Sequence, residues 1–198
     1  MKTVKALLSI VAVAMLIGCA GSGVGKFGPY NTSADGEDKR LMLNGYDPVA
    51  YHTTRELTRG KPGIRTEFDG VTYRFGSEAT KQAFLQSPER YVPLFGGYCA
   101  NGIVYGIPWG GDADQWSVID GRLVIFGGVS SRNYFLMYRE PNMTLAQQYW
   151  KDEVGGHAAL WQRVKRLVMR VPHYKTGAQL EAEWQQSRQQ PLAPASAK

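Results

Sequence analysis

The sequence predicts an α+β fold, in which a small domain of two β-hairpins and a helix is followed by a helical C-terminal addition. Asp69-Gly70 and Asp120-Gly121 each interrupt a run of alternating apolar residues, which is the pattern of a two-residue hairpin turn. Ser77 precedes apolar residues at helical spacing and is a good helix N-cap. After Ser130 the apolar spacing becomes helical, which places the addition behind the domain.

The small domain is expected over residues 41–130. GYDPVAYHT, residues 45–53, combines a turn-forming Asp-Pro with an apolar run, and predicts a turn that leads into a short strand. RTEFDGVTYRFGS, residues 65–77, is the first hairpin, whose candidate inward-facing residues are Phe68, Val71, Tyr73 and Phe75. Ser87-Pro88 ends the helix that Ser77 begins, and QWSVIDGRLVIFG, residues 115–127, is the second hairpin.

The helical addition is expected over residues 131–188, with a disordered tail over 189–198. A first helix should end at Pro141, and a second should begin at Asn142 or Thr144. A third segment, residues 157–172, places an apolar stripe on one side of a helix: Leu160, Trp161, Val164, Leu167, Val168 and Val171. Its polar side is basic, with Arg163, Lys165, Arg166 and Arg170.

This basic helix has two interpretations. We expect its apolar stripe to pack on the domain, which leaves the cationic side chains solvated. In the alternative, the helix lies on anionic lipid or on another acidic surface.

The N-terminus predicts export and lipid attachment. An apolar run from Ala6 to Ile17 follows two lysines and is too short to cross a hydrocarbon core about 30 Å thick, so residues 1–18 are a predicted signal peptide. Leu16-Ile17-Gly18-Cys19 resembles the bacterial lipobox, which implies that Cys19 is acylated and that membrane lipid is a partner. Residues 19–40 are rich in Gly, Ser, Asn and Asp, and predict a flexible tether from the lipidated Cys19.

Localisation and charge narrow the classes of partner. Ala20 is not the aspartate that, by the same resemblance, retains lipoproteins at the inner membrane, so we expect the outer membrane, facing the periplasm. The formal net charge is +6, and the signal peptide takes Lys2 and Lys5 with it. So mild a charge on an exported protein argues against a nucleic-acid partner. A periplasmic protein partner stays open.

Several short motifs, in order, resemble the YHS-domain family and its exported bacterial lipoprotein branch. They cover roughly residues 41–128 and are Gly45–Tyr51, Tyr73–Phe75 with Ser77-Glu78, Phe84, Pro88–Tyr91, Gly96–Ala100, Trp116 and Asp120–Leu123. The resemblance implies an α+β YHS-like domain. Many compact members hold heavy metals at a strand-to-helix junction that resembles Phe-Cys-Ser-Glu-His-Cys-Lys. Here residues 75–81 read FGSEATK, so that metal site is not carried over.

Cys99 is the cysteine that lipidation leaves free, since the chain has only two. It is a buried small hydrophobe, a reactive thiol, half of an intermolecular bridge or a metal ligand. As a ligand it would bind Cu(I) or another soft metal, with His52 or a methionine as helper. Nucleophilic catalysis needs a base beside the thiol, and the spacing of His52, His157 and His173 does not predict one. We therefore expect no catalytic residues and no enzyme.

Four aromatic residues near the signature segments are candidates for a ligand pocket: Tyr46, Tyr51, Tyr98 and Trp109. Aromatic packing in the core is the alternative interpretation. The resulting functional hypothesis is a membrane-anchored, non-catalytic binding or accessory module, with soft-metal (copper) handling as its most specific version. The alternative is an interaction lipoprotein that docks a partner protein or an anionic surface through its basic helix.

Overall fold

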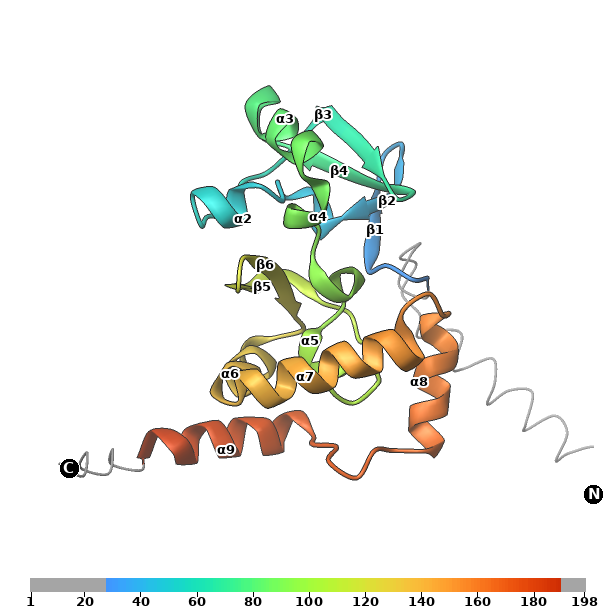
Figure 1. The fold of residues 1–198 in the computed structure, drawn as a ribbon, viewed down its shortest axis with the longest axis vertical. Coiled ribbons are helices and arrows are strands. Elements are labelled where there is room, and N and C mark those ends of the chain that lie inside the picture. Colours follow the sequence, from blue (N-terminus) through green and yellow to red (C-terminus); the bar gives the residue numbers. More distant parts are fainter. Residues whose placement is uncertain (1–27, 190–198) are drawn as a thin grey trace, which may run out of the picture.

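A computed structural model describes residues 28–189 and has the predicted α+β character, with one four-stranded and one two-stranded sheet in the described part (Figure 1). The four-stranded sheet lies at one end with α2 (Ala50–Thr53) and α3 (Glu78–Gln86). The helices α6 (Val129–Met137), α7 (Arg139–Tyr149), α8 (Ala159–Val168) and α9 (Gly177–Gln189) gather at the other end. The predicted signal peptide, Cys19 and nearly all of the predicted tail lie outside the described residues.

The four-stranded sheet begins earlier in the chain than predicted. Its strands are β1 (Thr32–Asp35), β2 (Asp38–Met42), β3 (Lys61–Phe68) and β4 (Val71–Phe75), in the spatial order β1-β2-β4-β3. β1 pairs with β2, and β3 with β4, in antiparallel register, whereas β2 and β4 run parallel. The prediction of a flexible tether over residues 19–40 is therefore wrong for its described part.

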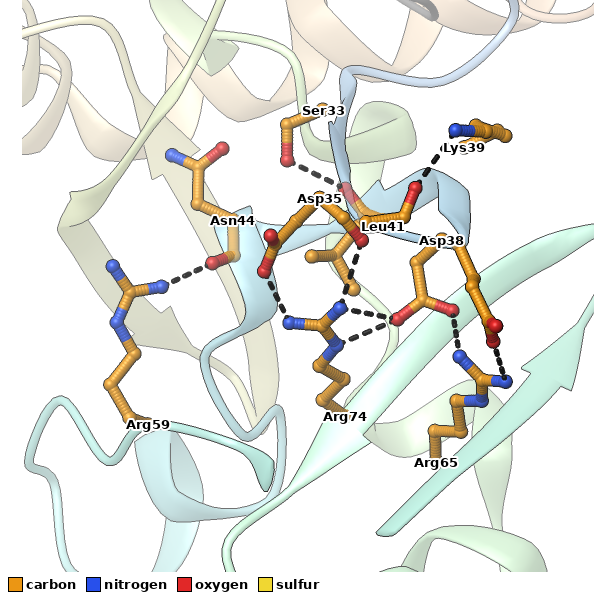
Figure 2. Close-up of polar contacts among 11 residues, drawn as sticks. Ser33, Asp35, Asp38, Lys39, Leu41, Asn44, Arg59, Arg65 and Arg74 are labelled. Carbon is orange, nitrogen blue, oxygen red and sulfur yellow. Dashed lines mark hydrogen bonds and ion pairs between the residues drawn. The ribbon is translucent and has the colours of Figure 1, made fainter. Parts of the chain in front are cut away.

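A buried arginine explains why such a polar segment forms strands. The Arg74 guanidinium on β4 lies 2.5 Å from the Asp35 carboxylate and 2.6 Å from the Asp38 carboxylate (Figure 2). Arg65 on β3 reaches the other carboxylate oxygen of Asp38 at 2.7 Å. Arg74 and Asp38 are both buried, so the pair is desolvated and its geometry is restrictive. These contacts fasten the β1–β2 hairpin to the sheet.

Both predicted hairpin turns are confirmed. β5 (Asp112–Ile119) pairs with β6 (Arg122–Phe126) as the second sheet. Each turn has positive φ at both central residues, +52° and +67° at Asp69-Gly70 and +48° and +73° at Asp120-Gly121. Positive φ at both central residues is the conformation of a type I′ turn, which matches the right-handed twist of the flanking strands, and Asp-Gly adopts it readily.

Ser77 caps α3 as predicted, since its Oγ accepts a hydrogen bond of 3.2 Å from the Thr80 N–H. The strand predicted after Asp-Pro is wrong, because residues 50–53 form the short helix α2. The buried Asp47 carboxylate accepts bonds from the N–H groups of Val49 and Gly76. Asp47 thereby starts the helical turn and ties it to the end of β4.

The remaining helical segments are η1 (Leu43–Gly45), α4 (Pro88–Tyr91), η2 (Leu94–Gly97), α5 (Ala100–Ile103), α6 (Val129–Met137), α7 (Arg139–Tyr149), η3 (Trp150–Val154), α8 (Ala159–Val168) and α9 (Gly177–Gln189). A helical addition is thus present. Pro141 does not end a helix as predicted, because it lies in the first turn of α7. The N–H group that proline lacks would have no partner in that turn anyway.

Strand β6 separates two hydrophobic cores. Leu123 and Ile125 pack into the core beside the four-stranded sheet, while Val124 and Phe126 pack into the core beneath the helices. This is the alternation expected of a strand that is covered on both faces. The predicted inward positions are confirmed, with Val71, Tyr73 and Phe75 buried and Phe68 packed at the edge of the first core.

Candidate functional site

The basic helix, α8, turns its basic side toward the domain and its apolar side toward solvent, the reverse of the expected orientation. Its apolar stripe faces outward, with exposed fractions of 71% at Trp161, 66% at Leu167 and 84% at Val168. Leu160, Val164 and the following Met169 are exposed as well. We call these six residues, Leu160, Trp161, Val164, Leu167, Val168 and Met169, the apolar face of α8. Of the predicted stripe, only Val171 is buried.

The basic side of α8 holds the helix against the domain. The Arg163 guanidinium donates two hydrogen bonds to the carbonyl oxygen of Pro108, at 3.0 and 2.7 Å. Arg166, only 8% exposed, pairs with the Glu153 carboxylate at 2.6 Å and donates to the carbonyl oxygen of Met169. Lys165 reaches the same carboxylate at 2.5 Å. The expectation of a packed apolar stripe is therefore wrong, because a carboxylate and backbone carbonyls lie beneath the helix. The expectation of solvated cations is wrong for Arg163 and Arg166, whereas Lys165 and Arg170 are exposed.

The charges beneath α8 change the ionisation of their neighbours. Burial raises the pKa of Glu153, but hydrogen bonds and charges from Lys165 and Arg166 outweigh it, so the pKa lies below its ordinary value. Burial lowers the pKa of Arg163. A partly desolvated cluster with more cations than anions favours an additional anion.

A cavity of about 250 Å³ lies between α8 and the domain. We call it the α8 cavity. Its lining residues are Ile107, Trp109, Arg163, Arg166, Leu167, Arg170 and Tyr174. The ring centroids of Trp109 and Tyr174 are 6.1 Å apart, and the Arg170 guanidinium lies 4.9 Å from the Tyr174 centroid. The structure thus brings together a predicted pocket residue, Trp109, and the three arginines of the predicted basic segment.

The predicted aromatic residues do not share one pocket. Tyr51 and Tyr98 are buried core residues, and their hydroxyls donate to the carbonyl oxygens of Ala113 and Gly28. Tyr46 lies under the Arg59 guanidinium beside a separate polar cavity, and only Trp109 lines the α8 cavity. These four residues therefore do not form a common pocket, and the alternative interpretation, aromatic packing in the core, holds for Tyr51 and Tyr98.

Ile107 and Tyr174 line the α8 cavity but were not predicted as site residues. Neither belongs to a recognisable motif. Tyr174 reaches the cavity because the chain turns back after α8, and its N–H bonds the carbonyl oxygen of Val171. A second cavity of about 250 Å³, with Tyr30, Tyr73, Phe95 and Trp150 among its lining residues, was also not predicted.

Cys99 is a packed position just before α5. Its side chain is 2% exposed. Burial raises the pKa of the thiol, and this effect outweighs the hydrogen bonds with backbone groups of Gly102 and Gly127, which act to lower the pKa. Gly127 packs against the sulfur: a Cβ atom at Gly127 would lie in van der Waals contact with Sγ, at 3.5 Å. A buried neutral thiol of this kind behaves as a small hydrophobe.

His52 and Cys99 have different neighbours in the structure. Its ring meets Tyr91 edge to face at a centroid distance of 5.2 Å, and burial together with Arg90, Arg122 and Arg55 lowers its pKa. Of the other histidines, His173 shares a hydrogen bond with the carbonyl oxygen of Val104 and His157 with that of Gly155. Over residues 28–189 there is no group of three or more His, Cys, Asp or Glu residues that could hold a metal ion.

No family model, curated protein or solved structure matches the chain. None of the helices within residues 28–189 has the length and hydropathy needed to span a membrane.

Proposed function

We propose that this protein is a lipid-anchored, non-catalytic interaction module of the bacterial envelope, and that it lays the apolar face of α8 on the membrane that holds its anchor. The observation that carries the proposal is the orientation of α8, whose basic side binds the domain while its apolar side is exposed. The resemblance to YHS domains does not suggest an activity, because the cysteine and histidine ligands of the family's metal site are missing from residues 75–81.

An exposed apolar face of this size favours association with another apolar surface. Fully burying one large apolar side chain is worth about 1.5–3 kcal/mol, so six exposed ones represent a strong tendency to associate. Single exposed apolar residues are ordinary, but a contiguous patch marks an interaction surface. A helix with Trp and Leu on one side and Arg and Lys on the other is typical of helices that lie in the membrane interface.

The charge of the surrounding chain favours a lipid surface over a protein one. No acidic residue occurs between Glu153 and Glu181, a stretch that contains Arg163, Lys165, Arg166, Arg170 and Lys175. Arg163 and Arg166 bind the domain, whereas Lys165 and Arg170 are exposed. Exposed basic residues beside an interfacial helix are attracted to anionic lipid headgroups, at roughly 1 kcal/mol each. A neutral apolar partner would gain nothing from them.

The first described residues lie on the same side of the molecule as the segment that leads into α8. Gly96 lies close to both Pro29 and the ring of Trp150. A Cβ atom at Gly96 would lie only 2.7 Å from the Pro29 carbonyl oxygen and 3.2 Å from the Trp150 ring. Trp150 begins η3, which leads into α8, and Figure 1 shows the first described residues beside this junction. Cys19 precedes Gly28 by nine residues, which span about 30 Å at most. A membrane at the anchor would therefore be within reach of α8.

A fluorophore on the apolar face tests the proposal. The mature lipidated chain carrying Val168→Cys would be labelled with an environment-sensitive dye and inserted by its anchor into vesicles of phosphatidylethanolamine and phosphatidylglycerol. Cys99 is buried and should not react. The matched control is Gln86→Cys, an exposed position at the end of α3, away from α8 (Figure 1).

We expect a blue-shifted emission at position 168 and a water-like emission at position 86. Equal, water-like emission at both positions would overturn the proposal. A blue shift at 168 that grows with protein density, and that persists when detergent replaces the lipid, would also overturn it, because a second copy of the chain would then cover α8.

A further inference from the structure

We propose that the α8 cavity binds an anionic lipid, with its phosphate at Arg170 and Arg163 and the adjoining carbons of its acyl chains against Trp109 and Leu167. Three arginines line the cavity together with apolar and aromatic residues, and no acidic residue lines it. The inference rests on the proposed function in one respect, since the membrane under α8 would supply the lipid.

Arg166 and Arg170 bring positive charge to the cavity, and the carboxylates at ion-pair distance within residues 28–189 do not balance it. Glu153 forms ion pairs with both Arg166 and Lys165, so one carboxylate neutralises two cations only in part. Within the described part of the chain no carboxylate lies at ion-pair distance from Arg170, whose guanidinium stacks over Tyr174. The buried Nε of Arg166 is a further donor without a hydrogen-bond partner among residues 28–189. An anion with several oxygens would meet these requirements, as arginine binds phosphate well.

The walls of the cavity select an anion that carries an apolar chain. Ile107, Trp109, Leu167 and Tyr174 supply most of the lining between the arginines. A free inorganic anion would leave these surfaces exposed to water. The volume of about 250 Å³ is below the roughly 300–1,000 Å³ of common small-molecule sites, so it accommodates part of a lipid.

The position of Leu167 joins the cavity to the proposed membrane surface. This side chain lines the cavity and is also a member of the apolar face of α8. A lipid in the adjacent leaflet could therefore place its phosphate among the arginines while its chains stay in the membrane. The cavity would select the lipids on which the helix lies.

Short-chain lipids that stay monomeric in water test the cavity apart from membrane docking. The mature lipidated chain in a neutral detergent would be titrated with dihexanoylphosphatidylglycerol, with dihexanoylphosphatidylcholine and with glycerol phosphate. The readout is the NMR signal of the Trp109 indole N–H, assigned by its loss in Trp109→Phe. Because no bilayer is present, failure of this binding and failure of α8 docking are separate outcomes.

Two charge-neutralising variants on the same segment give the matched comparison. Arg170→Gln removes a cavity cation, whereas Lys165→Gln removes a cation that does not line the cavity. We expect phosphatidylglycerol to shift the Trp109 signal, Arg170→Gln to weaken its binding about tenfold, and Lys165→Gln to change it less than about twofold. Phosphatidylcholine and glycerol phosphate should both bind about tenfold more weakly than phosphatidylglycerol.

Three results would overturn the inference. The first is no shift of the Trp109 signal with phosphatidylglycerol. The second is equal weakening by Arg170→Gln and Lys165→Gln, which would mean general charge attraction. The third is glycerol phosphate binding as tightly as the lipid, which would mean a simple anion site with no recognition of the apolar chain.

Discussion

The Arg166 guanidinium lies 2.6 Å from the Glu153 carboxylate, and this ion pair holds α8 with its basic side turned toward the domain. Arg166 is buried, so it would be costly to leave this charge without its partner. The orientation of the apolar face therefore depends on Glu153, which comes just before α8 in the chain.

Acid should loosen this arrangement. Because the pKa of Glu153 in the folded protein lies below its ordinary value of 4.5, the unfolded chain binds a proton more readily. The stability that Glu153 contributes is therefore fully present above about pH 5 and is lost as pH falls through the folded pKa. Urea unfolding between pH 6 and pH 3 should show a loss that is smaller in Glu153→Gln. Glu140→Gln, at an exposed ion pair, is the control, and a pH profile of Glu153→Gln identical to wild type would contradict the prediction.

Arg74 should matter more for stability than Arg65, although both pair with Asp38. Removing the buried Arg74 leaves the Asp38 carboxylate desolvated with only one partner, so Arg74→Met should cost about 3 kcal/mol of the free energy of unfolding. Arg65 is 41% exposed, and Arg65→Met should cost under about 1 kcal/mol. Chemical denaturation of both variants measures this difference. Equal losses would show that burial of the Arg74 pair is unimportant.

Cys19 should carry the lipid. Labelled palmitate supplied to cells that express the protein should be incorporated into the wild type and not into Cys19→Ala, because the acyl groups attach at that residue. Cys99→Ala is the matched control and should label normally. Incorporation that survives in Cys19→Ala would disprove the lipobox prediction.

Cys99 should be inert in the folded protein. Burial raises the pKa of its thiol and excludes reagents, so a water-soluble thiol reagent should modify it only as fast as the domain opens. The same reagent should react at once in denaturant. Fast native reaction, or one equivalent of Cu(I) bound by wild type and absent in Cys99→Ala, would instead support the soft-metal hypothesis.

Local signals were enough for the elements that local chemistry stabilises. Asp69-Gly70 adopts the backbone conformation that its turn needs, and Ser77 caps α3 with its own hydroxyl, so both are visible in a few adjacent residues. The β1–β2 hairpin was missed because Arg74, far along the chain, stabilises its polar strands. No pattern within residues 28–40 indicates such a partner.

The candidate site shows a different limit. Helical periodicity correctly grouped Trp161, Leu167 and Val168 on one side of a helix, but periodicity does not decide which side is buried. That choice depends on the Pro108 carbonyl and the Glu153 carboxylate, which attract the arginines to the domain. The usual expectation that apolar residues turn inward therefore gave the wrong orientation.

The depth of Trp161 in a membrane tests the central claim most directly. Vesicles containing the anchored protein would be made with lipids brominated at different positions along the acyl chain, and quenching specific to Trp161 would be taken as the difference from Trp161→Phe. The apolar side of an interfacial helix lies about 5–10 Å deep, so bromines near the headgroup should quench Trp161 more strongly than bromines at the chain ends. If Trp161→Phe shows the same quenching as wild type with every lipid, then α8 does not lie on the membrane.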